Sequence, residues 1–486
     1  MNKRFVVAMW IIVFVAFILR FYNYTNRWGL AYDQAHDALV ARYALEAGKI
    51  PLVGPFSSAG AFQTGGEWYW LIMGATVLHP QSILTPWIML TLLSVLFVYT
   101  IILVGKELVD KRYALVVGLL SAFSTAQIAQ SVNLTNQSPI ALISLLAIWS
   151  MARYVKTRNK IYVFFLFFFP VLAATVHLQG AALMILPVIT LLFVGIPALS
   201  YLTLGGIGAI LPLSPILLYD MQHKFFNIRN MFQYYFWNDQ QITFDALGRR
   251  WLTYLGVFWP TELAHMIGGY LPIAYLLIAG TVLTFIIKVI KRKLSKKFWI
   301  LLISFLFMAT LVRYTRTPLY SSYLMFLHPF VILLVGYAVY EIFKLNRLIG
   351  VVFTCLLIVG SMGKNIREIL FVENFTARQV NEWRNILYQQ YPKDRFAVYD
   401  LNYARKDKSL PLVLYLDADK RIDDKGKKIG MTITTSEIPL PHPSIFGEKG
   451  GYQLYDLTSS TSADLDSAGW AFVNPSAIYK STEEWQ

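Results

Sequence analysis

Two carboxylates with a spacing suited to chemistry occur in the segment LAYDQAHDALVARYALEAGK, residues 30–49. Asp33 and Asp37 are four residues apart, and the surrounding pattern is helical, so both side chains lie on one face of the predicted helix. A carboxylate partly removed from water can take a proton from a hydroxyl or amine acceptor as a general base. A structural role is the alternative: Asp33 can be the N-cap and Gly48 the C′ residue, with Asp37 stabilising the first turn.

The elements around these carboxylates predict a loop that stays close to a membrane surface. The helix is amphipathic, with Leu39, Val40, Tyr43 and Ala44 on one side, and an apolar run precedes it. After the helix come the glycine- and serine-rich GPFSSAGAFQTGGEW and an aromatic cluster, WYW, at residues 68–70. Tryptophan and tyrosine favour the lipid headgroup level, so we expect the loop to fold back onto the membrane.

The composition predicts a polytopic membrane protein. Of the 486 residues 56% are hydrophobic and 15% charged, whereas soluble domains carry about 25% charged residues. Apolar runs that approach the roughly 20 residues needed to cross a bilayer recur until Gly363. We predict about eleven transmembrane helices: the N-terminal anchor and residues 86–105, 113–130, 139–155, 161–177, 178–196, 203–219, 271–287, 298–312, 323–341 and 348–363.

Four short basic loops predict the orientation, because lysine and arginine are retained on the cytoplasmic side. These loops are residues 106–112, 153–160, 288–297 and 341–347. All four fall inside if the N-terminus is cytoplasmic, and we expect the membrane to be a prokaryotic cytoplasmic membrane. The net charge of +15 is then a topology signal with some attraction to anionic lipid, and it does not require a nucleic-acid partner.

This orientation divides the chain into two predicted domains. Residues 1–365 form a transmembrane domain with a first outer loop, 23–85, and a second, 220–270. Residues 366–486 form a small extracytoplasmic α/β domain. Its predicted elements are a helix in TARQVNEWRNILYQQYP, strands in DRFAVYDLNY and SLPLVLYLDA, and a charged turn in KRIDDKGKKIG. The predicted fold class is therefore an all-α polytopic membrane protein with a small C-terminal α/β domain.

The first outer loop also resembles a known family. YDQAHDALVARYALEAGKIPLVGPFSSAGAF followed by GGEWYWLIMG is similar to the first outer loop of GT-C fold membrane glycosyltransferases, in the family-39 and aminoarabinose transferase-like group. ATVHLQGAALMILPVI at 174–189 and RTPLYSSYLMFLHPFVILLVGYAV at 316–339 resemble later segments of the same family. The resemblance covers roughly residues 1–365.

The resemblance implies sugar transfer from a polyprenyl-phosphate or polyprenyl-diphosphate donor to a glycan, lipid or protein acceptor at the outer membrane face. Asp33 matches the catalytic aspartate of the family and would act as the base in a single, inverting displacement. We predict that Asp33 serves both as this base and as the helix cap. Asp37 would bind the acceptor or support the site. Two positions depart from the family: His36 stands where many relatives have arginine, and Glu67 stands where relatives often have a Gly-Pro or Pro-Pro pair.

The leaving lipid phosphate needs cationic groups that stabilise its charge. The candidates are Arg42, Arg313, Arg316 and His177, and each could instead be a membrane-surface anchor or a packing residue. The sequence contains no HExxH or comparable ligand cluster and predicts no cofactor, although carboxylates could hold a divalent ion. The aromatic and amide-rich loop 220–270 suits a sugar-covering lid or, equally, a segment that touches only lipid.

Two other functions remain open at this point. A lipid or solute transporter, or a flippase, would leave Asp33 and Asp37 with structural roles, but it predicts ionisable residues in the middle of the membrane. The predicted spans are almost free of such residues. A non-catalytic scaffold with a GT-C-like fold is the other alternative, since the departures at His36 and Glu67 do not reveal whether activity is retained.

Overall fold

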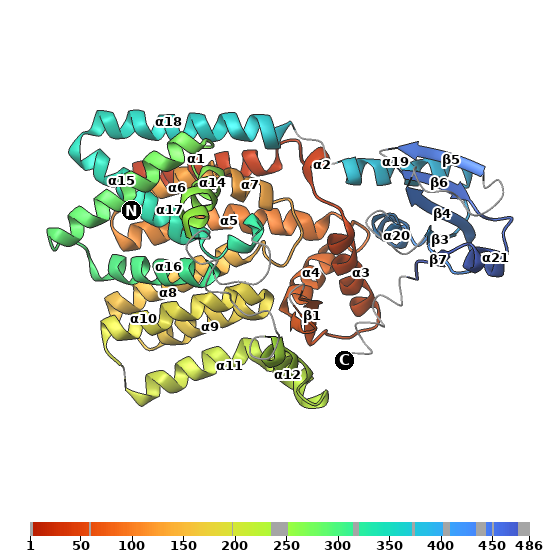
Figure 1. Cartoon of the computed structure of the whole chain (residues 1–486), viewed down its shortest axis with the longest axis horizontal. Coiled ribbons are helices and arrows are strands. Elements are labelled where there is room, and N and C mark those ends of the chain that lie inside the picture. Colours follow the sequence, from red (N-terminus) through yellow and green to blue (C-terminus); the bar gives the residue numbers. More distant parts are fainter. Residues whose placement is uncertain are drawn as a thin grey trace.

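The computed structural model describes most of the chain. The described residues are 3–57, 60–196, 198–234, 251–313, 320–371, 375–401, 409–433, 444–449 and 452–474. Figure 1 shows a bundle of helices that run side by side, with a mixed α/β unit at one end and the helices of the first outer loop between the two.

Seven described helices are long and apolar enough to cross a membrane. They are α1 (Lys3–Phe21), α5 (Thr85–Leu108), α8 (Ile140–Thr157), α11 (Leu199–Gln222), α15 (Leu271–Ile290), α17 (His328–Leu345) and α18 (Arg347–Asn365), the last continued by a π-helical turn, Ile366–Leu370. Four further helices lie in the remaining predicted spans: α6 (Lys111–Ala122), α9 (Ile161–Val176), α10 (Ile185–Val194) and α16 (Lys296–Arg313). The first three are shorter, and α16 has charged residues at both ends.

The predicted span 113–130 is wrong as a single helix. It is divided into α6, which ends at Ala122, and α7 (Thr125–Gln130). Ser124 lies between them in an extended conformation, and its hydroxyl accepts a hydrogen bond from the Gln127 backbone N–H. A serine N-cap of this kind starts a new helix because it satisfies an amide that the first turn leaves unpaired.

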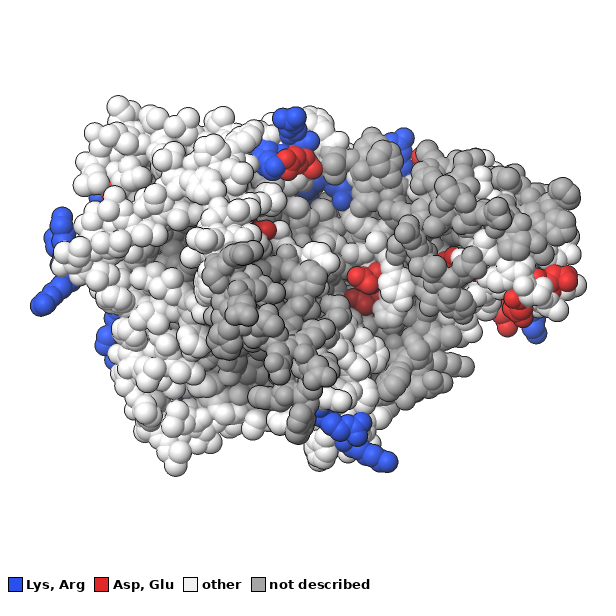
Figure 2. Space-filling model, viewed as in Figure 1, with Lys and Arg blue, Asp and Glu red and all other residues white. Residues whose placement is uncertain are grey.

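The four basic loops lie at the same end of the bundle. Glu107 forms an ion pair with Lys156 at 2.9 Å, and its backbone carbonyl accepts a hydrogen bond from Lys297 at 2.7 Å. Glu341 pairs with Lys288 at 2.6 Å. Figure 2 shows few charged side chains over the body of the bundle and lysine or arginine at its left edge. Shared placement of these loops is what the positive-inside pattern requires.

The first outer loop contains α2 (Tyr24–Arg27), α3 (Tyr32–Glu46), β1 (Val53–Phe56), β2 (Gln63–Gly65) and α4 (Glu67–Leu78), with β1 and β2 antiparallel. The buried Arg27 guanidinium fixes the start of the loop by donating to carbonyls at the C-terminal end of α1. Cationic groups are favourable at that end of a helix.

The ends of α3 correct one prediction and confirm another. The N-cap is Ala31 and not Asp33, because the Gln34 side chain accepts a hydrogen bond from the Ala31 backbone N–H at 3.0 Å and takes over the capping. Gly48 follows the helix with φ at +65°, the left-handed conformation that glycine adopts readily at C′.

The second outer loop and two connections contain short elements. They are α12 (Phe226–Phe232), a π-helical turn (Tyr254–Phe258), α14 (Trp259–Met266) and the 3₁₀ turns Leu178–Met184 and Ser321–Leu324. Asn227 at the start of α12 joins this loop to the first one, since its side-chain oxygen accepts a hydrogen bond from the Gln63 backbone N–H at 2.7 Å.

The C-terminal unit has a five-stranded mixed sheet of order β5-β6-β4-β3-β7. Its elements are α19 (Phe375–Gln390), β3 (Phe396–Leu401), α20 (Ser409–Ala418), β4 (Lys427–Ile433), β5 (Ser444–Lys449), β6 (Tyr452–Asp456), α21 (Ser462–Ser467) and β7 (Trp470–Phe472). Strands β3 and β4 are parallel and the other pairs are antiparallel. The predicted first helix and first strand are present in the structure.

The predicted strand in SLPLVLYLDA is wrong, because this segment is helix α20. All ten of its residues are buried, and a short apolar run buried on every side has no periodicity that separates a helix from a strand. Pro411 is compatible with the helix because it lies in the first turn, where its missing N–H has no intrahelical partner.

The first outer loop and the C-terminal unit share one hydrophobic core. Trp28, Leu39 and Trp68 of the loop belong to the same buried cluster as Val380 of α19 and Leu414 of α20. The α/β unit is therefore packed directly on the loop that carries the two candidate carboxylates.

Candidate functional site

Asp37 is buried and fixed by three neighbours. Its side chain is 5% exposed, and its carboxylate accepts hydrogen bonds from Trp68 Nε1 at 2.7 Å and from the Tyr69 hydroxyl at 3.4 Å. The ring nitrogen Nδ1 of His36 lies 3.1 Å from the same carboxylate. The hydrogen bonds from Trp68 and Tyr69 to Asp37 hold α3 against α4.

Asp33 has a different environment, although it is on the same helix face. It lies in the first turn of α3 and is exposed. Burial raises the pKa of the Tyr69 hydroxyl well above its ordinary value, and the charges of Asp37 and Asp33 add to the shift. Asp33 is therefore within electrostatic reach of the site where Asp37 is held, but its side chain faces solvent.

His36 stands between the two carboxylates and is positioned by an aromatic ring. Its imidazole stacks on Tyr32 with ring centroids 5.8 Å apart. Together with the contact to Asp37, this fixes the ring orientation at the surface of α3.

Glu67 begins α4 and is removed from water without a matching partner. Both of its carboxyl oxygens are buried, and neither has a hydrogen bond of good geometry to a described residue. A Cβ built on Gly65 would lie 2.2 Å from Glu67 Oε2 and 2.9 Å from Thr175 Cβ, so the carboxyl occupies the space over this glycine, beside the end of α9. Burial raises the pKa of Glu67 to about 7. Polar contacts of its own backbone and of the Thr175 side chain lower the pKa by a smaller amount.

Arg42 is engaged by the C-terminal unit. Its Nε donates to Asp417 Oδ2 at 2.9 Å and its terminal nitrogen donates to the Pro80 carbonyl at 2.7 Å. The hydroxyl of Tyr43 donates to the other oxygen of Asp417 at 2.9 Å. These contacts favour a role for Arg42 in holding α20 on α3, and they do not favour the predicted role in binding a donor phosphate.

Arg313 remains available for an anion within the part of the chain that the structure describes. It ends α16, and its Nε and one terminal nitrogen are buried without a hydrogen-bond partner there. The guanidinium lies over the rings of Trp251 and Tyr254, 6.0 and 5.9 Å from their centroids. Arg316 lies outside the described residues.

His177 lies at the C-terminal end of α9, near the late outer segment. Its ring packs against Tyr323 with centroids 5.1 Å apart, seven positions after Arg316. The second outer loop reaches the same segment, because the buried Glu262 accepts a hydrogen bond from the Ser321 hydroxyl at 2.8 Å. The structure thus brings His177 to the segment that follows Arg316, and Glu67 to the end of the helix that carries His177.

Sequence reasoning missed three residues that organise the site. Trp68 and Tyr69 were expected at the membrane surface, but both are fully buried as hydrogen-bond donors to Asp37. Only Trp70 of this cluster is exposed. Asp417 lies far along the chain, and no local pattern pairs it with Arg42.

A metal centre of protein ligands is not formed by the described residues, in which no three histidine, cysteine, aspartate or glutamate side chains come together. Three candidate carboxylates lie in different environments. Asp33 is exposed, Asp37 accepts hydrogen bonds from its neighbours, and Glu67 is buried beside Thr175.

Comparison with solved structures identifies the fold. ArnT from Cupriavidus metallidurans in the apo state aligns with 93% of this chain and 98% of its own, with a TM-score of 0.63 and 11% identity. The same enzyme bound to undecaprenyl phosphate aligns with 95% of this chain and 99% of its own, with a TM-score of 0.64 and 11% identity. An apo oligosaccharyltransferase from Archaeoglobus fulgidus aligns with 81% of this chain and 59% of its own, with a TM-score of 0.50 and 12% identity.

The sequence itself matches no family model and no curated protein. At this level of identity the structural likeness establishes the fold alone. The chain has the GT-C fold, as the resemblance of the first outer loop implied, and with its seven long apolar helices it is an integral membrane protein.

Proposed function

We propose that the protein is a membrane glycosyltransferase that moves a sugar from a polyprenyl-phosphate donor to an acceptor at the outer face of a prokaryotic cytoplasmic membrane. The acceptor is a glycan, a lipid or a protein. The observation that carries the proposal is the GT-C fold over 95% of the chain, shared with an enzyme whose structure holds undecaprenyl phosphate.

Asp33 is the general base in this proposal. Its exposure on the first turn of α3 lets an acceptor hydroxyl or amine approach it from solvent, whereas Asp37 is buried against Trp68, Tyr69 and His36. The acceptor oxygen or nitrogen attacks the anomeric carbon as its proton passes to Asp33. The bond to the lipid phosphate breaks, and the phosphate leaves with the electron pair, so one displacement inverts the configuration.

Arg313 is the first choice for stabilising the departing phosphate. Two of its nitrogens are buried without a described partner, and a planar guanidinium presents paired donors that match phosphate oxygens. A cation of this kind lowers the barrier because it meets charge that grows as the bond breaks. Arg316 and His177 are further candidates for binding the phosphate, because Arg316 belongs to the same outer segment and His177 lies beside it. His36 and Glu67 are candidates for contacts with the acceptor.

The distribution of charge supports an outer location for the reaction. The basic loops cluster at one end of the bundle through Glu107 and Glu341, and α3 and α4 lie toward the other end (Figure 1). Since basic loops are retained in the cytoplasm, this distribution supports an outward-facing first outer loop and C-terminal unit.

The test is transfer of labelled sugar by the purified protein from a panel of polyprenyl-phosphate sugars to a membrane acceptor extract. Labelled product that depends on the protein and on the lipid phosphate supports the proposal. The competing transporter function is measured in parallel, with the same lipids in sealed vesicles. Movement of the lipid across the vesicle membrane without transfer to any acceptor would contradict the glycosyltransferase and favour a flippase.

A further inference from the structure

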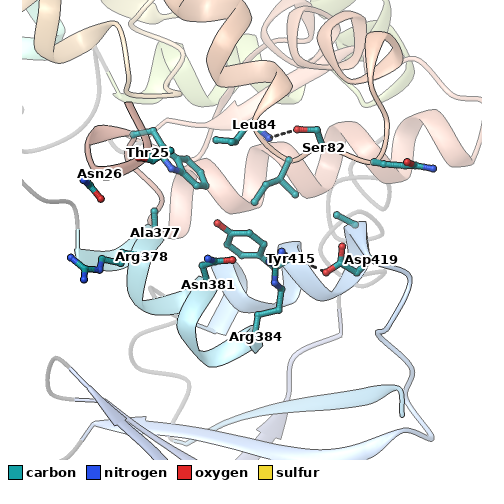
Figure 3. A pocket seen from close by; sticks show the side chains of 14 residues that line it. Thr25, Asn26, Ser82, Leu84, Ala377, Arg378, Asn381, Arg384, Tyr415 and Asp419 are labelled. Carbon is teal, nitrogen blue, oxygen red and sulfur yellow. Dashed lines mark hydrogen bonds and ion pairs between the residues drawn. The ribbon is translucent and has the colours of Figure 1, made fainter. Parts of the chain in front are cut away.

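A cavity of about 520 Å³ lies between the first outer loop and the C-terminal unit. Helix α2 and the segment before α5 line one side, and side chains of α19 and α20 line the other (Figure 3). Small-molecule sites in proteins commonly measure about 300–1,000 Å³ and occur at domain interfaces. The cavity is thus large enough for a ligand and exists because the two units are packed together.

Arg384 of α19 is a fixed donor in this cavity. Its guanidinium lies over the Tyr415 ring, 5.0 Å from the centroid, and near Tyr388 at 5.9 Å. The nearest carboxylate oxygen, on Asp419, is 3.7 Å away, beyond hydrogen-bond distance. The Nε atom is buried and has no partner among the described residues. Arg384 is therefore held in place while a donor remains unsatisfied, and burying such a group without a partner is costly.

Neutral polar side chains surround Arg384. Asn381 on α19 and Gln81 before α5 both line the cavity, and neither side chain has a hydrogen bond within the described part of the chain. Thr25 adds a hydroxyl on the side of α2. Amide groups donate and accept at once, which suits the alternating donor and acceptor capacity of sugar hydroxyls.

The charges in the cavity are compensated. Arg384 faces Asp419, and Arg378, the other cation in the lining, pairs with Glu382 at 3.3 Å. A polyanion would need uncompensated cations, and a lipid chain would need an apolar groove. The side chains present favour a neutral molecule with many hydroxyl groups, packed against Trp28 and Tyr415.

We propose that this cavity binds a neutral saccharide. In the proposed function, on which this assignment of role rests, the saccharide is a part of the acceptor remote from the reacting group. Arg42 donates to Pro80, next to Gln81, and it is nine positions after Asp33, about 13 Å along the axis of α3. The cavity thus lies away from the base, where it sets acceptor affinity and does not take part in bond cleavage.

Binding is tested first, independently of transfer. The full-length protein in nanodiscs is mixed with neutral trisaccharides of glucose, mannose, galactose or N-acetylglucosamine, and with counterparts that carry a uronic acid. Saturation-transfer NMR measures the affinity. We expect a neutral trisaccharide to bind. Asn381→Ala and Gln81→Ala should each weaken binding about fivefold, the loss of one neutral hydrogen bond, and Arg384→Lys should weaken it at least tenfold.

The matched control is Asn385→Ala, which changes an exposed asparagine on the same helix outside the cavity and should leave binding unchanged. Absence of binding by every neutral trisaccharide would overturn the proposal. So would binding that the three cavity variants do not alter, or binding confined to the uronic acid set, which would indicate an anion site.

A second readout separates this inference from the proposed function. With an active enzyme, the cavity variants should raise the KM for the acceptor and leave kcat and the donor KM unchanged. If the wild type binds a trisaccharide in the cavity but transfers no sugar, the saccharide site stands and the glycosyltransferase assignment fails. If it transfers sugar and the variants leave the acceptor KM unchanged, the cavity has no acceptor role.

Discussion

The two carboxylates of α3 have different environments despite their helical spacing. Asp37 accepts three contacts from Trp68, Tyr69 and His36, whereas Asp33 is exposed one turn earlier. Asp37 is buried behind these side chains, so an acceptor in solvent does not reach its carboxylate. The spacing could predict a shared helix face, but burial by α4 decides which carboxylate reaches solvent.

Replacing Asp37 with asparagine should destabilise the protein. The asparagine oxygen can still accept from Trp68 Nε1 and its nitrogen can face Tyr69, but the negative charge is lost. Hydrogen bonds to a charged group, worth about 1.5–3 kcal/mol, then become neutral ones worth about 0.5–1.5 kcal/mol. We expect a lower thermal unfolding midpoint for Asp37→Asn in detergent, while Asp33→Asn keeps the wild-type midpoint. Equal midpoints for Asp37→Asn and the wild type would contradict the hydrogen-bonded role.

Glu67 predicts a pH dependence of stability. Burial raises its pKa to about 7 in the folded protein, whereas an unfolded glutamate has a pKa of about 4.3. Between these values the folded state binds more protons, so this group's contribution to stability falls as the pH rises from about 4.3 to 7. The thermal unfolding midpoint of Glu67→Gln, compared with that of the wild type at the same pH, should become higher as the pH rises from about 5 to about 8. A pH-independent difference between the two proteins would contradict the buried carboxyl.

At the scale of elements, helix α20 is held on helix α3 by a polar contact within an apolar interface. Asp417 receives hydrogen bonds from Arg42 and Tyr43, and the Arg42 and Asp417 side chains are 11% and 9% exposed. From the sequence we predicted that Arg42 binds the donor phosphate, because an arginine beside a candidate base is suited to that role. Its actual partner is 375 positions away, and local spacing carries no information about such a contact.

Removal of the Asp417 carboxylate should loosen this contact. Asp417→Ala leaves the Arg42 cation nearly buried and unpaired, which costs roughly 3 kcal/mol. Arg395→Ala is the control, because its ion pair with Asp423 involves a side chain that is 63% exposed and such surface pairs contribute little. Chemical denaturation followed by tryptophan fluorescence measures both. Equal losses in the two variants would contradict a special role for Asp417.

The same interface explains which elements the sequence predicted well. Amphipathic α19 has a helical pattern, β3 is a short run of strand-forming residues, and both form where expected. Apolar length marked the long helices of the bundle. Helix α20 was read as a strand because it is buried on all sides between α3 and the rest of the C-terminal unit, which removes the pattern. Predictions were least accurate where segments that are distant in the sequence pack against each other and are buried together.

At the scale of the whole molecule, the chain is a GT-C bundle with an α/β unit whose hydrophobic core continues into the first outer loop. Composition and basic loops predicted the bundle and the shared placement of its loops. They predicted the C-terminal region as a separate domain, because the sequence shows a change of composition at its boundary and cannot show the loop residues that complete its core.

The isolated C-terminal region should therefore not fold stably. Residues 366–486 expressed alone lose Trp28, Leu39 and Trp68, which belong to the same buried cluster as α19 and α20. We expect aggregation or rapid proteolysis, compared with resistance of the same region in the full chain. A soluble, monomeric fragment with cooperative thermal unfolding would contradict the shared core.

The most direct test of the central claim is the rate of sugar transfer by Asp33→Asn, measured with the wild type and with Glu46→Gln. Asparagine keeps the shape of Asp33 but cannot accept the proton, and Glu46 is an exposed carboxylate at the other end of the same helix. General-base catalysis commonly contributes 10²–10⁴-fold, so kcat should fall by at least about 100-fold in Asp33→Asn and stay unchanged in Glu46→Gln. Transfer by a folded Asp33→Asn protein at the wild-type rate would contradict the assignment of Asp33 as the base.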